Sequence, residues 1–269
     1  MSTYLFKDQN TDHELKRLKL IETAFDEQSK QLIKHCGISE GMQCLEIGPG
    51  AGGILRWMGS QVGKSGLVFG VDKDIKHLSD LKDDPYKILE GNIAELNTHH
   101  RFDIIHVRYV LIHNKEAIEI LKKIFALLKP GGYAIIEEPD FGLAMDITGF
   151  GESAQNKVNQ AICALYEQMG LNPAYGSHLP SQCRNIGFSL EKVEAVSHIC
   201  NGGSSVAELM GISINVLREK YKSTGVVSDA EIDVYIQNSK SERHWAHYYT
   251  TVSVVLKKKA SPDHKKLEN

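Results

Sequence analysis

Four glycines fall within six positions of the sequence LEIGPGAGG, at residues 45–53, and the helix-like run ILRWM follows them. Glycine adopts positive φ angles and lets a ligand approach the backbone, and the first turn of a helix offers N–H groups without intrahelical partners. A strand, a glycine turn and a helix N-terminus together favour a nucleotide-like cofactor. The alternative is a tight turn with no ligand, because a lone glycine motif is weak evidence.

An acidic residue, Asp72, follows a second apolar run, LVFGV, about 20 residues beyond the glycines. A carboxylate at the end of this strand can accept hydrogen bonds from both hydroxyls of a ribose. Asp72 and Asp74 also precede an apolar run, so either can instead cap a helix. We favour Asp72 for the ribose and include its neighbour Lys73 in the predicted cofactor site.

Asn92 and Ile93 come directly after a third, shorter run, YKILEG. The amide of Asn92 is suited to the edge of an adenine ring, with Ile93 packed on its face. Gly91 and Asn92 are also standard turn residues, so an ordinary turn stays open as the alternative.

Two candidate general bases follow later strands: His113 after FDIIHVR and Glu138 after YAIIE. The C-terminal ends of parallel strands form the ligand-binding edge of open α/β sheets. A histidine there can act as a base near neutral pH. His113 can equally cap a helix or pack in the core.

These motifs lie in a chain that alternates strand and helix five times, which predicts a parallel sheet with helices on both faces. The turn KPGG at 129–132 should end a helix and start the fifth strand. We therefore predict an α/β fold with a Rossmann-like sheet of seven strands, mostly parallel, and a helical cap. The strands are expected at 43–47, 67–71, 86–89, 101–108, 133–137, 187–199 and 247–257.

The remaining segments are assigned by apolar spacing and turn residues. Residues 11–36 are expected to form two amphipathic helices broken near Asp26, which either cover the sheet or form a lid that carries Tyr4 and Arg17 over the ligand. The regions are an N-terminal lid at 1–40, a cofactor-binding core at 41–140 completed by the last two strands, a cap at 141–186 and 200–246, and a tail at 258–269.

Composition narrows the function classes. The chain has 269 residues, 42% hydrophobic and 24% charged, with a net charge of −3, which provides no electrostatic case for nucleic acid. No apolar run reaches the roughly 20 residues that span a bilayer, and no secretory signal begins the chain. Five scattered cysteines without a C-x-x-C pair predict reduced thiols and no metal site. We expect a cytoplasmic protein.

The motifs LEIGPGAGG, VFGVD, EGNI, FDIIHVRYVLIH and LLKPGGYAIIEEPD, in this order, resemble those of class I S-adenosylmethionine-dependent methyltransferases. They cover about residues 43–140, and the order of five stretches is more specific than the glycine turn. The opening helices are similar to those of bacterial small-molecule methyltransferases of the ubiquinone-biosynthesis-like group.

The resemblance implies where the cofactor binds. Glu46 and the glycines would surround its methionine part, Asp72 its ribose and Asn92 its adenine, although the family often has aspartate where Asn92 stands. The implied cofactor-binding residues are Tyr4, Arg17, Glu46, Gly48, Pro49, Gly50, Gly52, Asp72, Lys73, Asn92, Ile93, Val107 and Arg108.

The function implied is direct in-line transfer of a methyl group to a small organic acceptor, which leaves S-adenosylhomocysteine. An oxygen or carbon acceptor would benefit from a base, with His113 the first candidate and Glu138 the second. The cap should shape the acceptor site. Its apolar and aromatic residues are compatible with a medium-sized organic substrate, and the alternative for most of them is that they only pack the cap: Phe141, Phe150, Tyr166, Tyr175, Leu209, Met210 and Tyr235.

Two other functions stay open. A nicotinamide dehydrogenase also uses Gly48, Gly50 and Gly53 with an acidic ribose ligand, although the glutamate before the glycines and the KPGG turn argue against it. A non-catalytic cofactor-binding or regulatory protein can keep the same fold, because fold does not guarantee function. The residues name neither the acceptor nor the oligomeric state, for which a dimer is one option.

Overall fold

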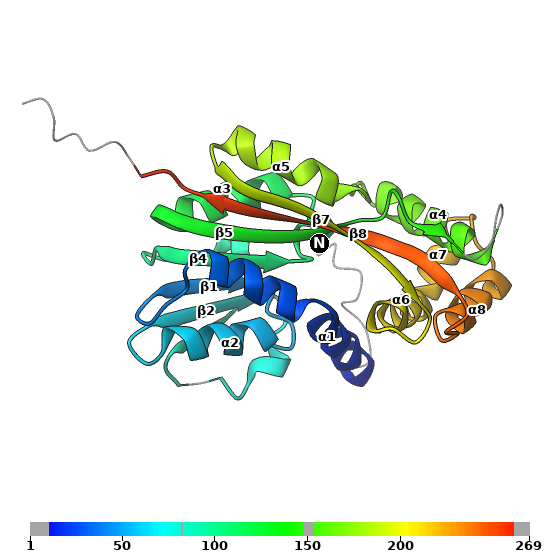
Figure 1. Ribbon diagram of the computed structural model, residues 1–269, viewed down its shortest axis with the longest axis horizontal. Coiled ribbons are helices and arrows are strands. Elements are labelled where there is room, and N and C mark those ends of the chain that lie inside the picture. The colour runs from blue at the N-terminus through cyan, green and yellow to red at the C-terminus, as the bar shows by residue number, and fades with distance from the viewer. Residues whose placement is uncertain (1–10, 82, 148–152, 261–269) are drawn as a thin grey trace, which may run out of the picture.

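One mixed sheet forms the centre of the protein (Figure 1). The computed structural model describes residues 11–81, 83–147 and 153–260, so Tyr4 and Phe150 lie outside the described residues. Within these residues the sheet has eight strands in the order β3-β2-β1-β4-β5-β8-β6, with β7 on the other side of β8. The strands are β1 Gln43–Ile47, β2 Leu67–Asp72, β3 Tyr86–Glu90, β4 Phe102–Arg108, β5 Leu128–Asp140, β6 Met145–Asp146, β7 Ser189–Asn201 and β8 Trp245–Lys257.

Strands β1 to β5 are parallel, and β8 runs antiparallel to both β5 and β7. This arrangement confirms the predicted α/β fold, with β6 as a two-residue addition to the seven expected strands. The central strands are apolar at nearly every position because helices cover both faces of the sheet. The carboxyl ends of β1, β2, β3 and β4 consequently meet at one edge.

Helices α1 and α2 lie on one side of the sheet in Figure 1, and α3 and α5 lie on the other. A second group, α4 and α6 to α8, surrounds the far ends of β7 and β8. The helices are α1 Thr11–His35, α2 Gly53–Val62, α3 Ala117–Leu127, α4 Ala154–Gln168, α5 Tyr175–Ile186, α6 Ser205–Val216, α7 Arg218–Lys222 and α8 Asp229–Asn238. Short 3₁₀ turns, η1 Lys76–Leu78, η2 Ile93–Glu95 and η3 Leu111–His113, follow β2, β3 and β4.

Helix α1 is continuous, which corrects the expectation of two helices broken near Asp26. No glycine or proline occurs between residues 11 and 35, and the Asp26 carboxylate lies 2.7 Å from the Arg108 guanidinium on β4. The buried aspartate therefore marks a contact with the sheet. The other half of α1 packs on α6, where Lys16 and Glu208 form an exposed ion pair, so this helix joins the core to the cap.

The KPGG segment lies within β5, whereas the sequence predicted a turn before that strand. Gly131 adopts a φ of +84° and donates its N–H to the carbonyl of Lys258 at 2.7 Å. The backbone N–H of Lys258 in turn bonds to Gly132 at 3.0 Å. The glycines thus form an irregular stretch that stays paired with the end of β8, where the register to β4 also shifts.

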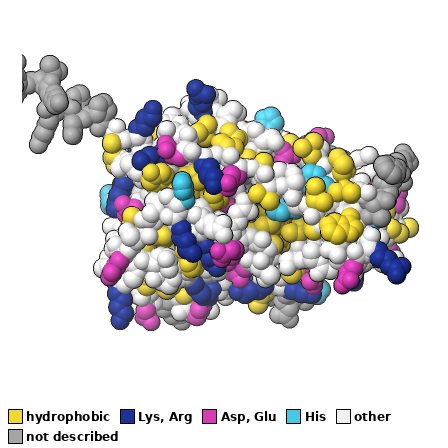
Figure 2. All heavy atoms as spheres, viewed as in Figure 1, with side chains coloured by type: hydrophobic (Ala, Val, Ile, Leu, Met, Phe, Trp, Pro, Cys, Tyr) yellow, Lys and Arg dark blue, Asp and Glu magenta, His cyan; other side chains and the backbone are white. Residues whose placement is uncertain are grey.

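The cap is carried by β7 and β8, which are 13 residues long and extend past the end of their pairing with β5. Strand β7 ends two residues later than predicted, at Asn201, and β8 begins two residues earlier, at Trp245. His244 directly precedes β8, and His247 lies within it. Figure 2 shows hydrophobic side chains gathered over the half of this face that holds these strands and the cap. Among the described residues no helix is long and apolar enough to cross a membrane.

Helix α5 belongs to the core, although the sequence assigned its residues to the cap. It packs on β5, β8 and α3 through buried residues that include Leu179 and Cys183. At Gly176 the helix approaches the sheet backbone so closely that a Cβ would lie 2.7 Å from the carbonyl oxygen of Glu138. This segment has few apolar residues, so the sequence did not indicate which face of the helix is buried.

Replacement of Gly176 by alanine should push α5 away from β5. We expect Gly176→Ala to lower the free energy of unfolding by about 1–3 kcal/mol, because overpacking forces the backbone to shift. Urea unfolding followed by circular dichroism measures this change. Ser181→Ala, at an exposed position of the same helix, is the control and should change stability by less than about 0.5 kcal/mol. Equal stability of the two variants would contradict this packing of α5.

Candidate functional site

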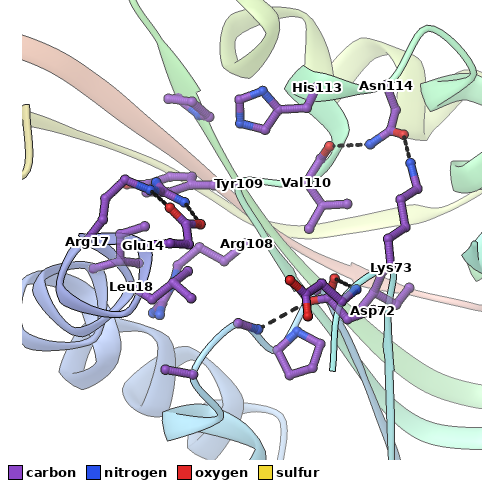
Figure 3. Close-up of a pocket in the computed structure, with 18 of the residues that line it drawn as sticks. Glu14, Arg17, Leu18, Asp72, Lys73, Arg108, Tyr109, Val110, His113 and Asn114 are labelled. Atoms are coloured by element: carbon purple, nitrogen blue, oxygen red, sulfur yellow. Dashed lines mark hydrogen bonds and ion pairs between the residues drawn. The ribbon is translucent and has the colours of Figure 1, made fainter. Parts of the chain in front are cut away.

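A large pocket of about 1440 Å³ lies at the carboxyl ends of β1, β2 and β4 and continues beneath the cap. Its walls come from the glycine turn, the ends of these strands, helix α1 and the cap helices α4, α6 and α7. Figure 3 shows the labelled side chains of α1 on one side and those of β2 and η3 on the other. The pocket therefore has one half against the core and one half against the cap.

The glycine turn after β1 forms the floor of the core half. Gly48 has a φ of +71°, and a Cβ on it would lie 2.4 Å from a methyl group of Val110. Glycine is required there on both counts. Gly48, Pro49 and Gly50 line the pocket. Gly52 instead packs against Arg56 and Leu78, outside the lining residues.

Asp72 lies at the end of β2 and faces the pocket. Its two carboxylate oxygens accept the backbone N–H groups of Gly50 at 3.3 Å and Asp74 at 3.2 Å. Burial raises the pKa of Asp72, and these N–H donors act against the rise. The carboxylate is thereby fixed beside the glycine turn with lone pairs left for a ligand. Lys73 bonds to Asn114 at 3.2 Å on the same wall (Figure 3).

Asn92 and Ile93 both line the pocket, next to Gly91. The Asn92 side-chain oxygen accepts the N–H of Ala94 at 3.1 Å and so caps η2, which is the turn role left open by the sequence. Ile93 is only 4% exposed. A Cβ on Gly91 would meet nothing within 4 Å, so the wall is open beside these two residues.

Two carboxylates face the N-terminus of α2. Glu22 of α1 accepts the backbone N–H of Gly53 at 2.7 Å, and a Cβ on Gly53 would lie 2.5 Å from a carboxylate oxygen of Asp26. Helix N-termini favour anions, and here side chains of the protein itself fill that place. The surroundings of the glycine turn are therefore acidic.

A buried chain of charged groups lies beneath the turn. Glu46 on β1 contacts His106 on β4, and the other ring nitrogen of His106 contacts Glu137 on β5 at 2.9 Å. Arg108 joins this chain to α1 through Asp26 and through the hydroxyl of Ser29. Glu46 and Arg108 line the pocket, whereas Val107, predicted at the cofactor, is buried in the core.

Tyr109 turns the chain from β4 into the pocket wall. Its φ of +57° is in the left-handed region, which is rare for a residue with a side chain. Its hydroxyl bonds to Thr251 on β8 at 2.6 Å, and its ring contacts Phe25 and Tyr249 edge-on. Tertiary contacts thus hold a conformation that the local sequence does not favour.

Glu138 organises the next turn. Its carboxylate accepts three backbone N–H groups, from Val110 at 3.0 Å, Leu111 at 2.7 Å and Ile112 at 3.1 Å. Glu138 is fully buried and is not among the residues that line the pocket. Its geometry is that of a group that supports η3, the element that carries His113.

His113 faces the pocket from η3, on the wall opposite Arg17 (Figure 3). Burial, together with repulsion from Arg17 and Lys73, lowers the pKa of His113 to about 3. The imidazole is therefore neutral at neutral pH. Its Nδ1 lies 3.5 Å from the hydroxyl of Tyr166 on α4, which places it where the two halves of the pocket meet.

The cap half of the pocket is apolar and aromatic. Of the cap residues expected to shape it, Phe141, Tyr166, Leu209 and Met210 do line it, whereas Tyr175 and Tyr235 are buried elsewhere. Arg17 and Glu14 of α1, predicted to be part of a lid, form a buried ion pair at 2.8 Å at its edge. The other residues of this half are Pro139, Ile162, Met169, Ser213, Leu217, Tyr221 and Tyr249.

A doubly wound sheet with a glycine turn and an acidic strand end at its ligand edge is a nucleotide-binding architecture. Residues 17–193 match the family described as Methyltransferase domain, and the chain belongs to that family. The sequence prediction of an S-adenosylmethionine-dependent methyltransferase family is confirmed.

Known relatives match parts of the chain. Phosphoethanolamine N-methyltransferase 1 of Zea mays is 26% identical over 44% of this chain and 25% of its own length. Demethylmenaquinone methyltransferase of Lactococcus lactis subsp. lactis is 31% identical over 39% of this chain and 45% of its own. The chain thus spans less than half the length of these relatives.

A solved structure agrees over nearly the whole fold. Phosphoethanolamine N-methyltransferase 2 of Haemonchus contortus, in complex with S-adenosyl-L-methionine, has a TM-score of 0.59. It is 19% identical, and the comparison covers 97% of this chain and 60% of the other. At this identity the likeness concerns the fold.

Sequence reasoning missed two side chains of the site, His106 and Glu22, whereas Tyr109 was expected near the ligand-binding edge and does line the pocket. His106 and Glu46 stand in otherwise apolar strands, and this pattern indicated a buried polar contact, since such groups need partners when buried. The partner strands, however, are 60 and 31 residues away from His106. Only the sheet order brings them together.

Acid should destabilise the protein through His113. Because its pKa is about 3 in the fold against an ordinary value of 6.5, the unfolded chain binds a proton that the folded chain does not between these values. This stability is fully present above pH 6.5 and decreases below it, with a slope approaching about 1.4 kcal/mol per pH unit.

Urea unfolding between about pH 7 and pH 4.5 measures this slope. We expect His113→Gln to lose stability less steeply than the wild type, while His178→Gln, at an exposed position, keeps the wild-type slope. Parallel pH profiles for all three proteins would show that His113 does not titrate as proposed.

Proposed function

We propose that this protein binds S-adenosylmethionine in the core half of the pocket and transfers its methyl group to a small organic acceptor in the cap half. The carrying observation is electrostatic. The residues around the glycine turn that face the α2 N-terminus and the pocket floor are carboxylates, Glu22, Glu46 and Asp72. They suit a nucleoside that carries positive charge.

The residues fit this cofactor. Asp72 has the place and the free lone pairs to bind the ribose hydroxyls, and Asn92 with Ile93 borders the open wall suited to adenine. Gly48 and Glu46 would border the methionine part. Lys73, Pro49, Gly50 and Arg108 line the same half and stay in the proposed cofactor site.

The acidic surroundings also distinguish this cofactor from a dinucleotide. A pyrophosphate binds at the helix N-terminus that follows the glycine turn. In this protein Glu22 already accepts the N–H of Gly53, with Asp26 adjacent. A second anion there would be repelled by both carboxylates, which argues against a nicotinamide dehydrogenase.

When bound, the cofactor supplies an electrophilic methyl group on a sulfonium, so the protein needs mainly to position the acceptor and exclude water. Helix α1 covers the pocket edge with the buried Glu14–Arg17 pair. Phe141 and Tyr166 of the cap and Tyr249 of β8 complete the enclosure. An in-line approach of the acceptor from the cap half is the geometry that this arrangement supports.

The acceptor that the cap half suits is neutral and apolar or aromatic. Its walls are formed by aliphatic and aromatic side chains, and the Arg17 charge is matched by Glu14. The name of the Lactococcus relative, which methylates a demethylmenaquinone, agrees with such a substrate. The phosphoethanolamine of the maize relative would bring a phosphate and an amine into this apolar half.

His113 is proposed to receive a hydrogen bond, and then the proton, from a hydroxyl or acidic carbon of the acceptor. His113 lines the pocket, and its imidazole is neutral at neutral pH. Glu138, the second candidate base, is proposed to act through η3, since its carboxylate already binds three N–H groups there. A cytoplasmic location and a dimer stay predictions.

The cofactor assignment is tested by titration calorimetry. We expect the wild type to bind S-adenosylhomocysteine with a micromolar Kd and to give no heat with NADH. Asp72→Ala should weaken S-adenosylhomocysteine binding about 10–100-fold, because a buried carboxylate with two ribose hydrogen bonds is lost. Asp80→Ala removes an exposed carboxylate that pairs with Arg56 and should bind as the wild type does. Binding of NADH alone would overturn the proposal.

Methyl transfer is tested by release of S-adenosylhomocysteine with a panel of neutral phenols and hydroquinones, and separately with amines. With a hydroxyl acceptor, His113→Ala should lower kcat by about 10²-fold or more, the typical contribution of a general base. His178→Ala is the surface control. A loss below about tenfold would exclude His113 as the base, and a cofactor-binding protein active on no acceptor would favour the non-catalytic alternative.

A further inference from the structure

The buried group at the centre of the sheet is a histidine held between two glutamates. His106 is 0% exposed, Glu46 4% and Glu137 1%. The Nδ1 of His106 lies 3.0 and 2.8 Å from the two oxygens of Glu46, and its Nε2 lies 2.9 Å from Glu137. Carboxylates only accept hydrogen bonds, and a neutral imidazole has a single N–H. With both glutamates ionised, these two close contacts need both ring nitrogens to donate, as in an imidazolium.

The charges in this chain do not cancel. The charged groups that face His106 are Glu46 on β1, Glu137 on β5, Arg108 on its own strand and Asp26 on α1. With His106 protonated, three carboxylates stand against two cations. One negative charge is left over in a buried place, where charge is costly unless it is matched.

The unmatched negative charge lies on the pocket side of this chain of groups, at Glu46. The Glu137 carboxylate accepts hydrogen bonds from Ser29 and Ser253 and contacts His106. Hydrogen bonds from His106 therefore lower the pKa of Glu137, although burial opposes this. Burial raises the pKa of Glu46, with His106 as the main opposing group. Of the two glutamates only Glu46 lines the pocket.

We propose that His106 is a positioning residue that keeps Glu46 ionised and oriented at the pocket wall, so that Glu46 binds a cationic ammonium group of the ligand. This inference rests on the proposed function, in which the ammonium belongs to the methionine part of the cofactor. The bound cation supplies the positive charge that the buried chain lacks. Without His106, Glu46 would take up a proton and lose its attraction for the ammonium.

The test compares two ligands that differ in this group. S-adenosylhomocysteine carries the ammonium, and 5′-methylthioadenosine lacks the whole amino-acid part. We expect His106→Gln to weaken S-adenosylhomocysteine binding at about pH 6.5 by at least about tenfold while changing 5′-methylthioadenosine binding less than about threefold, which is the selectivity of a lost ion pair. His100→Gln, a partly buried histidine outside the pocket that contacts Gln43, is the matched control.

The pH profile separates this role from a merely structural one. In His106→Gln the affinity for S-adenosylhomocysteine should recover as the pH is raised and Glu46 ionises, whereas the wild-type affinity should stay level over the same range. Equal weakening of both ligands, or no weakening of either, would overturn the inference. A wild type that binds neither ligand would instead overturn the proposed function.

A measurement on the wild type keeps the inference testable if His106→Gln does not fold. The ¹⁵N chemical shifts of His106 near neutral pH should be those of an imidazolium with two N–H groups, because the two carboxylates outweigh burial and raise the pKa of His106 to about 9. A neutral-imidazole spectrum at that pH would contradict the positioning role.

Discussion

The ionic contact between α1 and the sheet is the interaction on which the site depends. Arg108 bonds to Asp26 at 2.7 Å and to Ser29 at 2.8 Å, both on one continuous helix. Because that helix is rigid, fixing its middle also places Glu22 at the glycine turn and the Arg17 end over the pocket. Breaking a buried pair of this kind leaves an unmatched charge, so its geometry is strongly enforced.

The second constraint is the length of β7 and β8. Their pairing continues well past the end of β5, and helices α4 and α6 to α8 pack around this extension. The cap is therefore built on the same sheet as the cofactor half, with no separate hinge segment needed to bring them together. The pocket is therefore continuous between the two parts, acidic at the core end and apolar at the cap end. That polarity is what a charged nucleoside and a neutral acceptor would need.

Much of the core was readable because the signals are local. Period-two and continuous apolar runs, closed by glycine or acidic residues, predicted β1 to β4 closely and the middle of β5. The strand ends placed Asp72 and His113 at one edge. The errors occurred where a local pattern competes with tertiary contacts. Asp26 suggested a helix break although it is a buried ion-pair partner, and KPGG suggested a turn although its glycines pair with β8.

The sequence by itself determined the order of the core strands and the glycine turn, since each follows from spacing within about ten residues of chain, and it indicated the family through five motifs in a fixed order. Only the tertiary structure decided which polar groups share a site. Glu46, His106 and Glu137 come from three strands that are neighbours because of crossover connections, and Tyr109 holds a left-handed conformation that contacts with β8 impose. The physical reason is burial. In the low-polarity interior these polar groups, distant in sequence, must pair with one another, and their pairing sets the charge at the pocket.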